Sequence, residues 1–111
     1  MTLEETNIDG AEVLRLIGEA DLAAVPELQE KLAEKRDAGT DLLILDFAKT
    51  TFVNTPVWAL IVEYYQFTLK EKKHFALAGL GGRVLASFEI VQLGKFIDHF
   101  SNVEEAIAAK R

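Results

Sequence analysis

Two short apolar runs constrain what this chain can fold into. "LLILDF" (42–47) and "HFALAGL" (74–80) each have the length of a β-strand, and a helical pattern from Pro56 to about Lys72 separates them. An unbroken apolar run of this length is typical of a central strand that is covered on both faces. Strands that alternate with helices in this way predict an α/β domain, in which helices cover a mixed β-sheet.

The remaining patterns complete the alternation. In chain order they are a strand near residues 2–7, a strand over "EVLRLIGEAD" (12–21), a helix over "VPELQEKLAEKRDAG" (25–39), a helix over "GGRVLASFEIVQLG" (81–94), a short strand over "KFIDHF" (95–100) and a helix over "SNVEEAIAAKR" (101–111). Pro26 and Gly39 suit the start and the end of the first helix, and Ser101 with Glu104 has the spacing of a capping box. The predicted order is β-β-α-β-α-β-α-β-α in a single domain, residues 1–111.

Composition excludes several classes of function. The chain has 111 residues, no cysteine and a formal net charge of −6. The missing thiols exclude disulfides, thiolate metal sites and a cysteine nucleophile, and the negative charge argues against nucleic acid as a partner. The acidic N-terminus does not resemble a signal peptide, and no apolar stretch reaches the roughly 20 residues that span a bilayer. We therefore expect a soluble, cytoplasmic protein without membrane insertion.

No constellation of residues points to an enzyme, a cofactor or a metal. His74 and His99 are the only histidines, and neither has a partner at metal-ligand spacing. Ser87 lies outside a G-x-S-x-G elbow, so nucleophilic hydrolysis has no support. The turn "GLGGR" lacks the spacing of the nucleotide-binding glycine motifs. Gly81 and Gly82 are interpreted first as turn residues, with an anion site on their backbone amides as the alternative.

The helix that begins near Pro56 carries more apolar surface than one buried face needs. At about 100° per residue, the expected core stripe consists of Trp58, Ile61, Val62, Tyr65 and Leu69. A second stripe beside it consists of Val57, Leu60, Tyr64 and Phe67. Either another element of the domain or a partner has to cover this second stripe. We expect a partner, with a homodimer through this helix as one form of it.

Several segments, taken in order, resemble STAS domains, and most closely the free-standing anti-sigma factor antagonists of bacteria. "VLRLIGEADLAAVPELQEKL" is similar to the family's strand, Gly-Glu-x-Asp turn and first helix, with Gly18, Glu19 and Asp21 in register. "LLILDFAKTTFVNT" is similar to the central strand and the loop before the second helix, and "HFALAGLGGRVLASFEIVQLGKFI" to the next strand and third helix. The resemblance covers the chain from about residue 10 to the end.

The resemblance implies a non-enzymatic protein that binds an anti-sigma factor, commonly a serine kinase. That kinase phosphorylates a Ser or Thr at the start of the second helix, the added charge ejects the antagonist, and a phosphatase restores it. Here the candidate phosphoacceptor is Thr55. The expected partner-binding residues are Asp21, Asn54, Thr55, Val57, Leu60 and Tyr64.

The switch loop departs from the family's Asp-Ser-(Ser/Thr)-Gly-Leu-(Gly/Ala). Here Asn54 replaces the acidic residue, and Pro56 stands where many members carry the second hydroxyl. Pro56 suits the first position of a helix, which would make Thr55 the N-cap. Thr55 is therefore open to two interpretations, a helix cap alone or a phosphorylation site.

Two other functions stay open. The first is a STAS subunit held permanently in a larger complex, such as a lipid-transport ATPase assembly or a stress-signalling particle. The altered loop and the surplus apolar stripe both favour it. The second is a small-ligand module that binds a nucleotide or a lipid at the "GLGG" turn or between helices.

Overall fold

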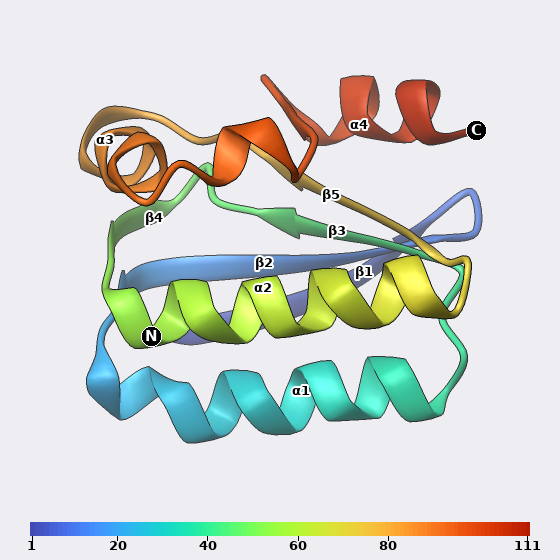
Figure 1. The fold of residues 1–111 in the computed structure, drawn as a ribbon, viewed down its shortest axis with the longest axis horizontal. Helices are drawn as coiled ribbons and strands as arrows, with labels where there is room; N and C mark the ends of the chain where they lie inside the picture. Colours follow the sequence, from blue (N-terminus) through green and yellow to red (C-terminus); the bar gives the residue numbers. More distant parts are fainter.

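A mixed β-sheet runs through the middle of the molecule, with α1 and α2 side by side along one side and α4 on the other (Figure 1). The computed structural model describes all residues, 1–111. Its elements are β1 (Thr2–Ile8), β2 (Ala11–Ala20), η1 (Leu22–Ala24), α1 (Val25–Asp37), β3 (Leu42–Asp46), β4 (Thr50–Val53), α2 (Thr55–Lys70), β5 (His74–Ala78), α3 (Gly82–Ile90), η2 (Leu93–Lys95), β6 (His99–Phe100) and α4 (Val103–Lys110). None of the helices is long and apolar enough to cross a membrane.

The predicted α/β class and mixed sheet are confirmed. The strands follow the order β1-β2-β3-β5-β6, with β1 antiparallel to β2 and the other pairs parallel. Every residue of β3 is buried, as are the last four residues of β5. The two apolar runs are therefore inner strands of the sheet, as their composition predicts.

The predicted order lacks one strand, β4. This strand has four residues and pairs in parallel with the last part of β2, beyond an irregularity at Gly18 and Glu19. Gly18 has a φ of +93°, a conformation that glycine adopts without strain, and its N–H donates to the carbonyl oxygen of Lys49 at 2.9 Å. β2 therefore pairs first with β3 and then with β4, and β4 delivers the chain to the start of α2.

The two faces of the sheet bury different amounts of apolar surface. On one face, α1, α2 and α3 pack over alternate residues of the inner strands in a cluster of 18 buried residues. On the other face, α4 packs in a cluster of nine, to which β5 contributes the small side chains Ala76 and Ala78. The face under α4 therefore carries the smaller part of the core.

Helix ends follow the sequence signals only in part. The helix predicted over 81–94 ends at Ile90, η2 follows it, and the strand predicted over 95–100 is reduced to β6. α1 has Pro26 in its first turn, and Gly39 lies just after its end with a φ of +69°, as predicted. The prediction that Ser101 caps the last helix is wrong by one residue. Asn102 is the N-cap of α4, and its Oδ1 accepts from the N–H of Glu105 at 2.9 Å. The Glu105 carboxylate accepts from the N–H of Ser101 at 3.3 Å, one residue before the N-cap whose N–H a capping box would use.

The expectation that a partner covers the second stripe of α2 is wrong for its main residues. Val57 is 0% exposed and Tyr64 is 5% exposed, so both belong to the core. Conversely, the predicted core residue Leu69 is 61% exposed. The reason is that α1 lies beside α2 and covers the stripe that the sequence left unassigned. Leu60 and Phe67 are partly buried against the same cluster.

Ion pairs hold α1 against the edge of the sheet. Lys35 Nζ lies 2.7 Å from Glu5 Oε1, and Lys31 Nζ lies 2.9 Å from Glu5 Oε2. The hydrogen bond from Lys35 to the Glu5 carboxylate, followed in size by that from Lys31, lowers the pKa of Glu5 from 4.5 to about 2. These partly exposed pairs fix how α1 lies on β1 rather than supplying much stability.

Candidate functional site

Asn54, and not Thr55, caps helix α2. Asn54 has extended backbone dihedrals, and its Oδ1 accepts from the N–H of Val57 at 3.3 Å. Its own N–H donates to the carbonyl oxygen of Ala20 at the end of β2, at 3.1 Å. The predicted capping role of Thr55 is therefore wrong by one residue. The shift is allowed because Pro56 lacks an N–H at a position whose N–H has no acceptor inside the helix.

Because the N-cap lies at Asn54, Thr55 has no capping role. It is the first residue of α2, its side chain is exposed, and Asn54 already supplies the cap. The start of α2 thus presents the Thr55 hydroxyl to solvent, and capping does not explain why a hydroxyl is there.

Thr55 borders a groove of about 480 Å³ between the start of α2 and α3, called here the α2–α3 groove. Its lining residues are Phe52, Val53, Asn54, Thr55, Arg83, Ala86, Ser87, Ile90 and Val91. Arg83 is the one charged residue among them, and its guanidinium carbon lies 5.5 Å from the centre of the Phe52 ring. Ile90 is 79% exposed at the rim. The groove therefore combines an exposed apolar side chain, one cation and one free hydroxyl.

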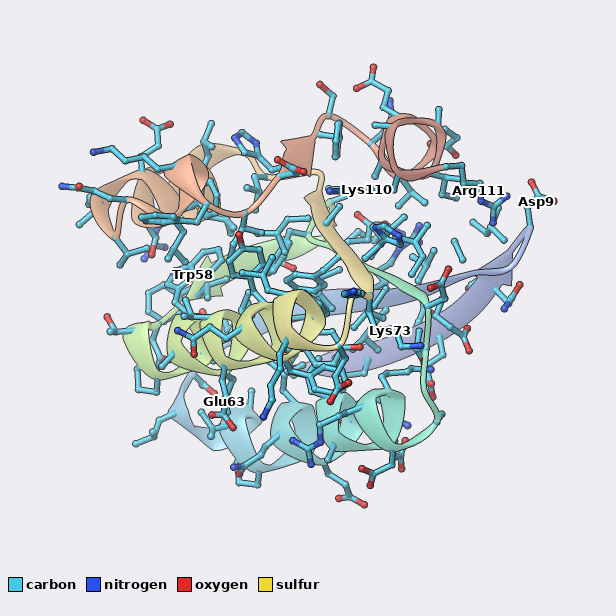
Figure 2. All side chains as sticks on the ribbon, turned by 45° about the vertical axis from the view of Figure 1, so that its right-hand side comes forward. Asp9, Trp58, Glu63, Lys73, Lys110 and Arg111 are labelled. Atoms are coloured by element: carbon cyan, nitrogen blue, oxygen red, sulfur yellow. The ribbon has the colours of Figure 1, made fainter.

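A short chain of hydrogen bonds fixes the wall of this groove. The indole N–H of Trp58 donates to Ser87 Oγ at 2.8 Å, and that hydroxyl donates to the carbonyl oxygen of Val53 at 3.3 Å. Trp58 is buried between α2 and α3 (Figure 2), with its ring 5.7 Å from that of Phe47 and 5.5 Å from that of Phe88. Ser87 thus joins α3 to the first turn of α2 and to the end of β4.

The structure brings together only part of the predicted partner-binding set. Asp21 directly follows the end of β2, where Ala20 pairs with Val53 of β4, so Asp21, Asn54 and Thr55 share one end of the sheet. Val57 and Tyr64 are buried, and Leu60 lines a different groove.

Sequence reasoning missed four residues around Thr55. Phe52 and Arg83 lie in the α2–α3 groove, Ile90 is at its rim, and Leu22 of η1 is 67% exposed just after Asp21. The signal for Arg83 was present in the sequence, because it directly follows the "GLGG" turn that delivers α3. The sequence alone gives no sign that the start of α2 and α3 line the same groove.

A second groove, of about 630 Å³, runs between α1 and α2 and is called here the α1–α2 groove. Its lining residues are Gln29, Leu32, Ala33, Arg36, Leu60, Glu63, Tyr64, Gln66, Phe67, Lys70 and Glu71. The hydroxyl of Tyr64 is buried and has no hydrogen-bond partner, and burial raises the pKa of Tyr64 to about 12. Charges of both signs line the rest, so this groove favours no charged class of ligand.

The described side chains offer no metal centre. No group of three or more His, Cys, Asp and Glu residues lies in an arrangement that could hold a metal ion.

Comparisons with known proteins agree with this architecture. The family model of the STAS domain matches residues 2–106, which extends the sequence resemblance to the first strand. An anti-sigma factor antagonist from Mycobacterium paratuberculosis superposes with a TM-score of 0.91 at 19% identity, over 99% of this chain and 93% of that one. No curated protein matches the chain at a significant level.

Two further structures share the fold. The Bacillus cell fate determinant SpoIIAA, in its phosphorylated form, gives a TM-score of 0.76 at 20% identity, over 99% of this chain and 100% of that one. A variant of RsbS from Moorella thermoacetica gives 0.81 at 15% identity, over 98% and 94% of the two chains. With the family model covering nearly the whole sequence, this chain belongs to the STAS domain family.

Proposed function

We propose that this domain is a non-enzymatic, cytoplasmic signalling module that binds an anti-sigma factor of the serine-kinase type, and that Thr55 is its phosphoacceptor. One observation carries the proposal. Thr55 is exposed at the first residue of α2 and is free of the capping role. Similar structures support it, because they include anti-sigma factor antagonists, one of them in a phosphorylated form.

The proposed docking surface surrounds Thr55. It consists of Asp21, Leu22, Asn54, Thr55, Phe52, Arg83 and Ile90. Leu22 and Ile90 are exposed apolar side chains, and Arg83 is the only charged residue of the groove, with Asp21 outside it. The groove side of this surface therefore fits a partner segment that is apolar and acidic. A homodimer through α2 loses its support, because α1 covers the stripe that suggested it.

Phosphorylation would change the charge of this surface and leave the fold intact. A phosphate adds about 1.5 to 2 negative charges at pH 7. Arg83 is the only charged residue of the α2–α3 groove, so the groove would change from positive to negative. An acidic partner segment would then be repelled. Because Asn54 supplies the cap, the phosphate would not cost α2 its N-terminal hydrogen bond.

The test is the intact mass of the protein isolated from its own cells, before and after phosphatase treatment, with fragmentation to locate the modification. We expect a phosphatase-sensitive phosphate on Thr55 in a fraction of the molecules. A Thr55→Val variant is the matched control, since it keeps the size of the side chain and removes the acceptor. Unmodified protein under every growth condition would contradict the switch.

A second candidate is a constitutive scaffold subunit. It is favoured by Pro56 and Asn54, because the first has no N–H and the second occupies the N–H of Val57, so α2 offers a phosphate few amides. Stable co-purification with one partner, with no phosphate on either protein, would support this candidate against the switch.

A further inference from the structure

A phosphate on Thr55 would find a poor anion site at the start of its own helix. Free N–H groups normally make a helix N-terminus attractive to phosphate. Here Pro56 has no N–H, the N–H of Val57 donates to Asn54 Oδ1 at 3.3 Å, and that of Trp58 donates to the Asn54 carbonyl oxygen at 3.2 Å. Thr55 itself supplies the one remaining amide of the first turn. A phosphate there needs another partner.

Arg83 is that partner by position and by chemistry. It lines the same groove as Thr55, on the opposite element α3, and no other charged residue lines it. Arg83 is exposed and takes part in no salt bridge, and its guanidinium group rests over the Phe52 ring at 5.5 Å. An exposed contact between a cation and a ring is weak, so a stronger partner can displace it. A guanidinium group binds phosphate through two parallel hydrogen bonds.

We propose that Arg83 is the intramolecular receptor of phosphorylated Thr55. This inference rests on the proposed function and names the regulation of that site. In the unmodified protein, the guanidinium group over Phe52 is available to an acidic segment of the partner. After phosphorylation it turns to the phosphate and bridges α2 and α3. The partner then loses its cation in addition to meeting a negative charge.

The experiment uses the full chain with phosphothreonine installed at position 55 during synthesis, so that no kinase is needed. The second pKa of the phosphate, ordinarily near 6, is measured by ³¹P NMR titration at about 0.1 M salt. We expect it to be about half a pH unit lower with Arg83 than in Arg83→Gln, because the cation favours the dianion. Arg83→Lys should lie between the two, since it keeps the charge and loses the paired hydrogen bonds. Any repulsion between the Asp21 carboxylate and the phosphate is the same in every variant, so it cancels from the difference in phosphate pKa.

Lys70→Gln is the matched control. It removes the same charge from the other end of α2, about 22 Å from Thr55 at 1.5 Å per residue and beyond the Debye length of about 10 Å. The phosphate pKa in this variant should equal that of the unaltered sequence. Equal phosphate pKa values with Arg83 and in Arg83→Gln would overturn the inference.

The two proposals can fail separately. If cells never phosphorylate Thr55, the proposed switch fails while the titration still reports whether Arg83 receives a phosphate. If the titration shows no effect of Arg83 on a domain that cells do phosphorylate, the switch stands and the receptor is wrong. Thermal melting of Arg83→Gln checks that this exposed position leaves the fold unchanged.

Discussion

The two grooves that flank α2 differ in the charges that line them and in what lies at their surface. The α1–α2 groove is lined by Leu60, Tyr64 and Phe67 of the second stripe and by charged residues of both signs, yet Tyr64 is only 5% exposed. The α2–α3 groove is smaller, and it has an exposed hydroxyl on Thr55, an isolated cation on Arg83 and an isoleucine that is 79% exposed. The surplus of apolar residues on α2 points to the first groove, whereas the exposure of Thr55, Arg83 and Ile90 points to the second.

The difference teaches that apolar residues in excess on a helix are covered by neighbouring elements before they are left for partners. α2 lies between the sheet, α1 and α3, so most residues of both stripes pack inside the domain, and Leu69 is the exposed exception. The residues still exposed for docking lie where α2 begins, because the N-terminus of this helix is at the end of the sheet.

The largest expected effect separates the two grooves directly. Tyr64→Glu should destabilise the domain by about 3 to 5 kcal/mol, because it buries a charge among the aromatic rings of Phe67 and Phe75. Thr55→Glu, on the exposed side, should stay within about 0.5 kcal/mol. Urea unfolding followed by circular dichroism measures both. If the Tyr64→Glu variant unfolds at the same urea concentration as the unaltered sequence, Tyr64 is not a core residue and belongs to the predicted partner-binding set.

A smaller effect should follow from cutting the wall of the α2–α3 groove. Ser87→Ala leaves the indole N–H of Trp58 without its acceptor, which should cost about 1 to 3 kcal/mol. Ser101→Ala removes an exposed hydroxyl elsewhere and should leave the free energy of unfolding nearly unchanged. If the two variants unfold at the same urea concentration, the hydrogen bond does not hold α3 to α2.

Capping gives the next prediction. Asn54→Ala should cost about 1 kcal/mol, because the N–H of Val57 loses its side-chain acceptor. Asn54→Asp should recover most of this, since aspartate caps as well. Thr55→Val should have almost no effect on thermal stability. The opposite ranking, with Thr55→Val the more damaging variant, would restore Thr55 as the cap and weaken its case as a phosphoacceptor.

The smallest effect concerns the hydroxyl of Tyr64. Tyr64→Phe should raise stability at pH 8 by up to about 1 kcal/mol, because it removes a buried group without a partner. The pKa of Tyr64 is about 12 in the folded state against an ordinary value of 10, so folding favours the neutral form. This contribution is complete below pH 10 and is lost as the pH rises towards 12. Urea midpoints at about pH 9 and 11, on either side of the ordinary tyrosine pKa, should show a loss that Tyr64→Phe lacks. An equal loss in both proteins would contradict the raised pKa.

The sequence predicted the sheet and its helices because the signals are local. Unbroken apolar runs, Pro26 and Gly39 act over a few residues, and the structure agrees with each of them. β4 was not predicted because four residues directly before a helix carry too little pattern, and because its pairing depends on the irregularity of β2 at Gly18, far away in the chain.

The site was predictable only in part. Asn54 and Thr55 are both good cap residues, and Pro56 tolerates the first or the second helical position, so propensity could not choose between them. Which stripe of α2 faces solvent depends on where α1 lies, which is a tertiary contact. For the same reason Arg83 could not be assigned to Thr55 before the packing of α3 on β4 was known.

The position of Trp58 also makes its fluorescence an intrinsic probe of the α2–α3 groove. It is the only tryptophan of the chain, and its indole N–H is bonded to the wall of the α2–α3 groove. Its fluorescence therefore comes from one place, within one helical turn of the proposed phosphoacceptor. A partner or a phosphate that moves α3 should shift the emission without any added dye, and events in the α1–α2 groove should leave it unchanged.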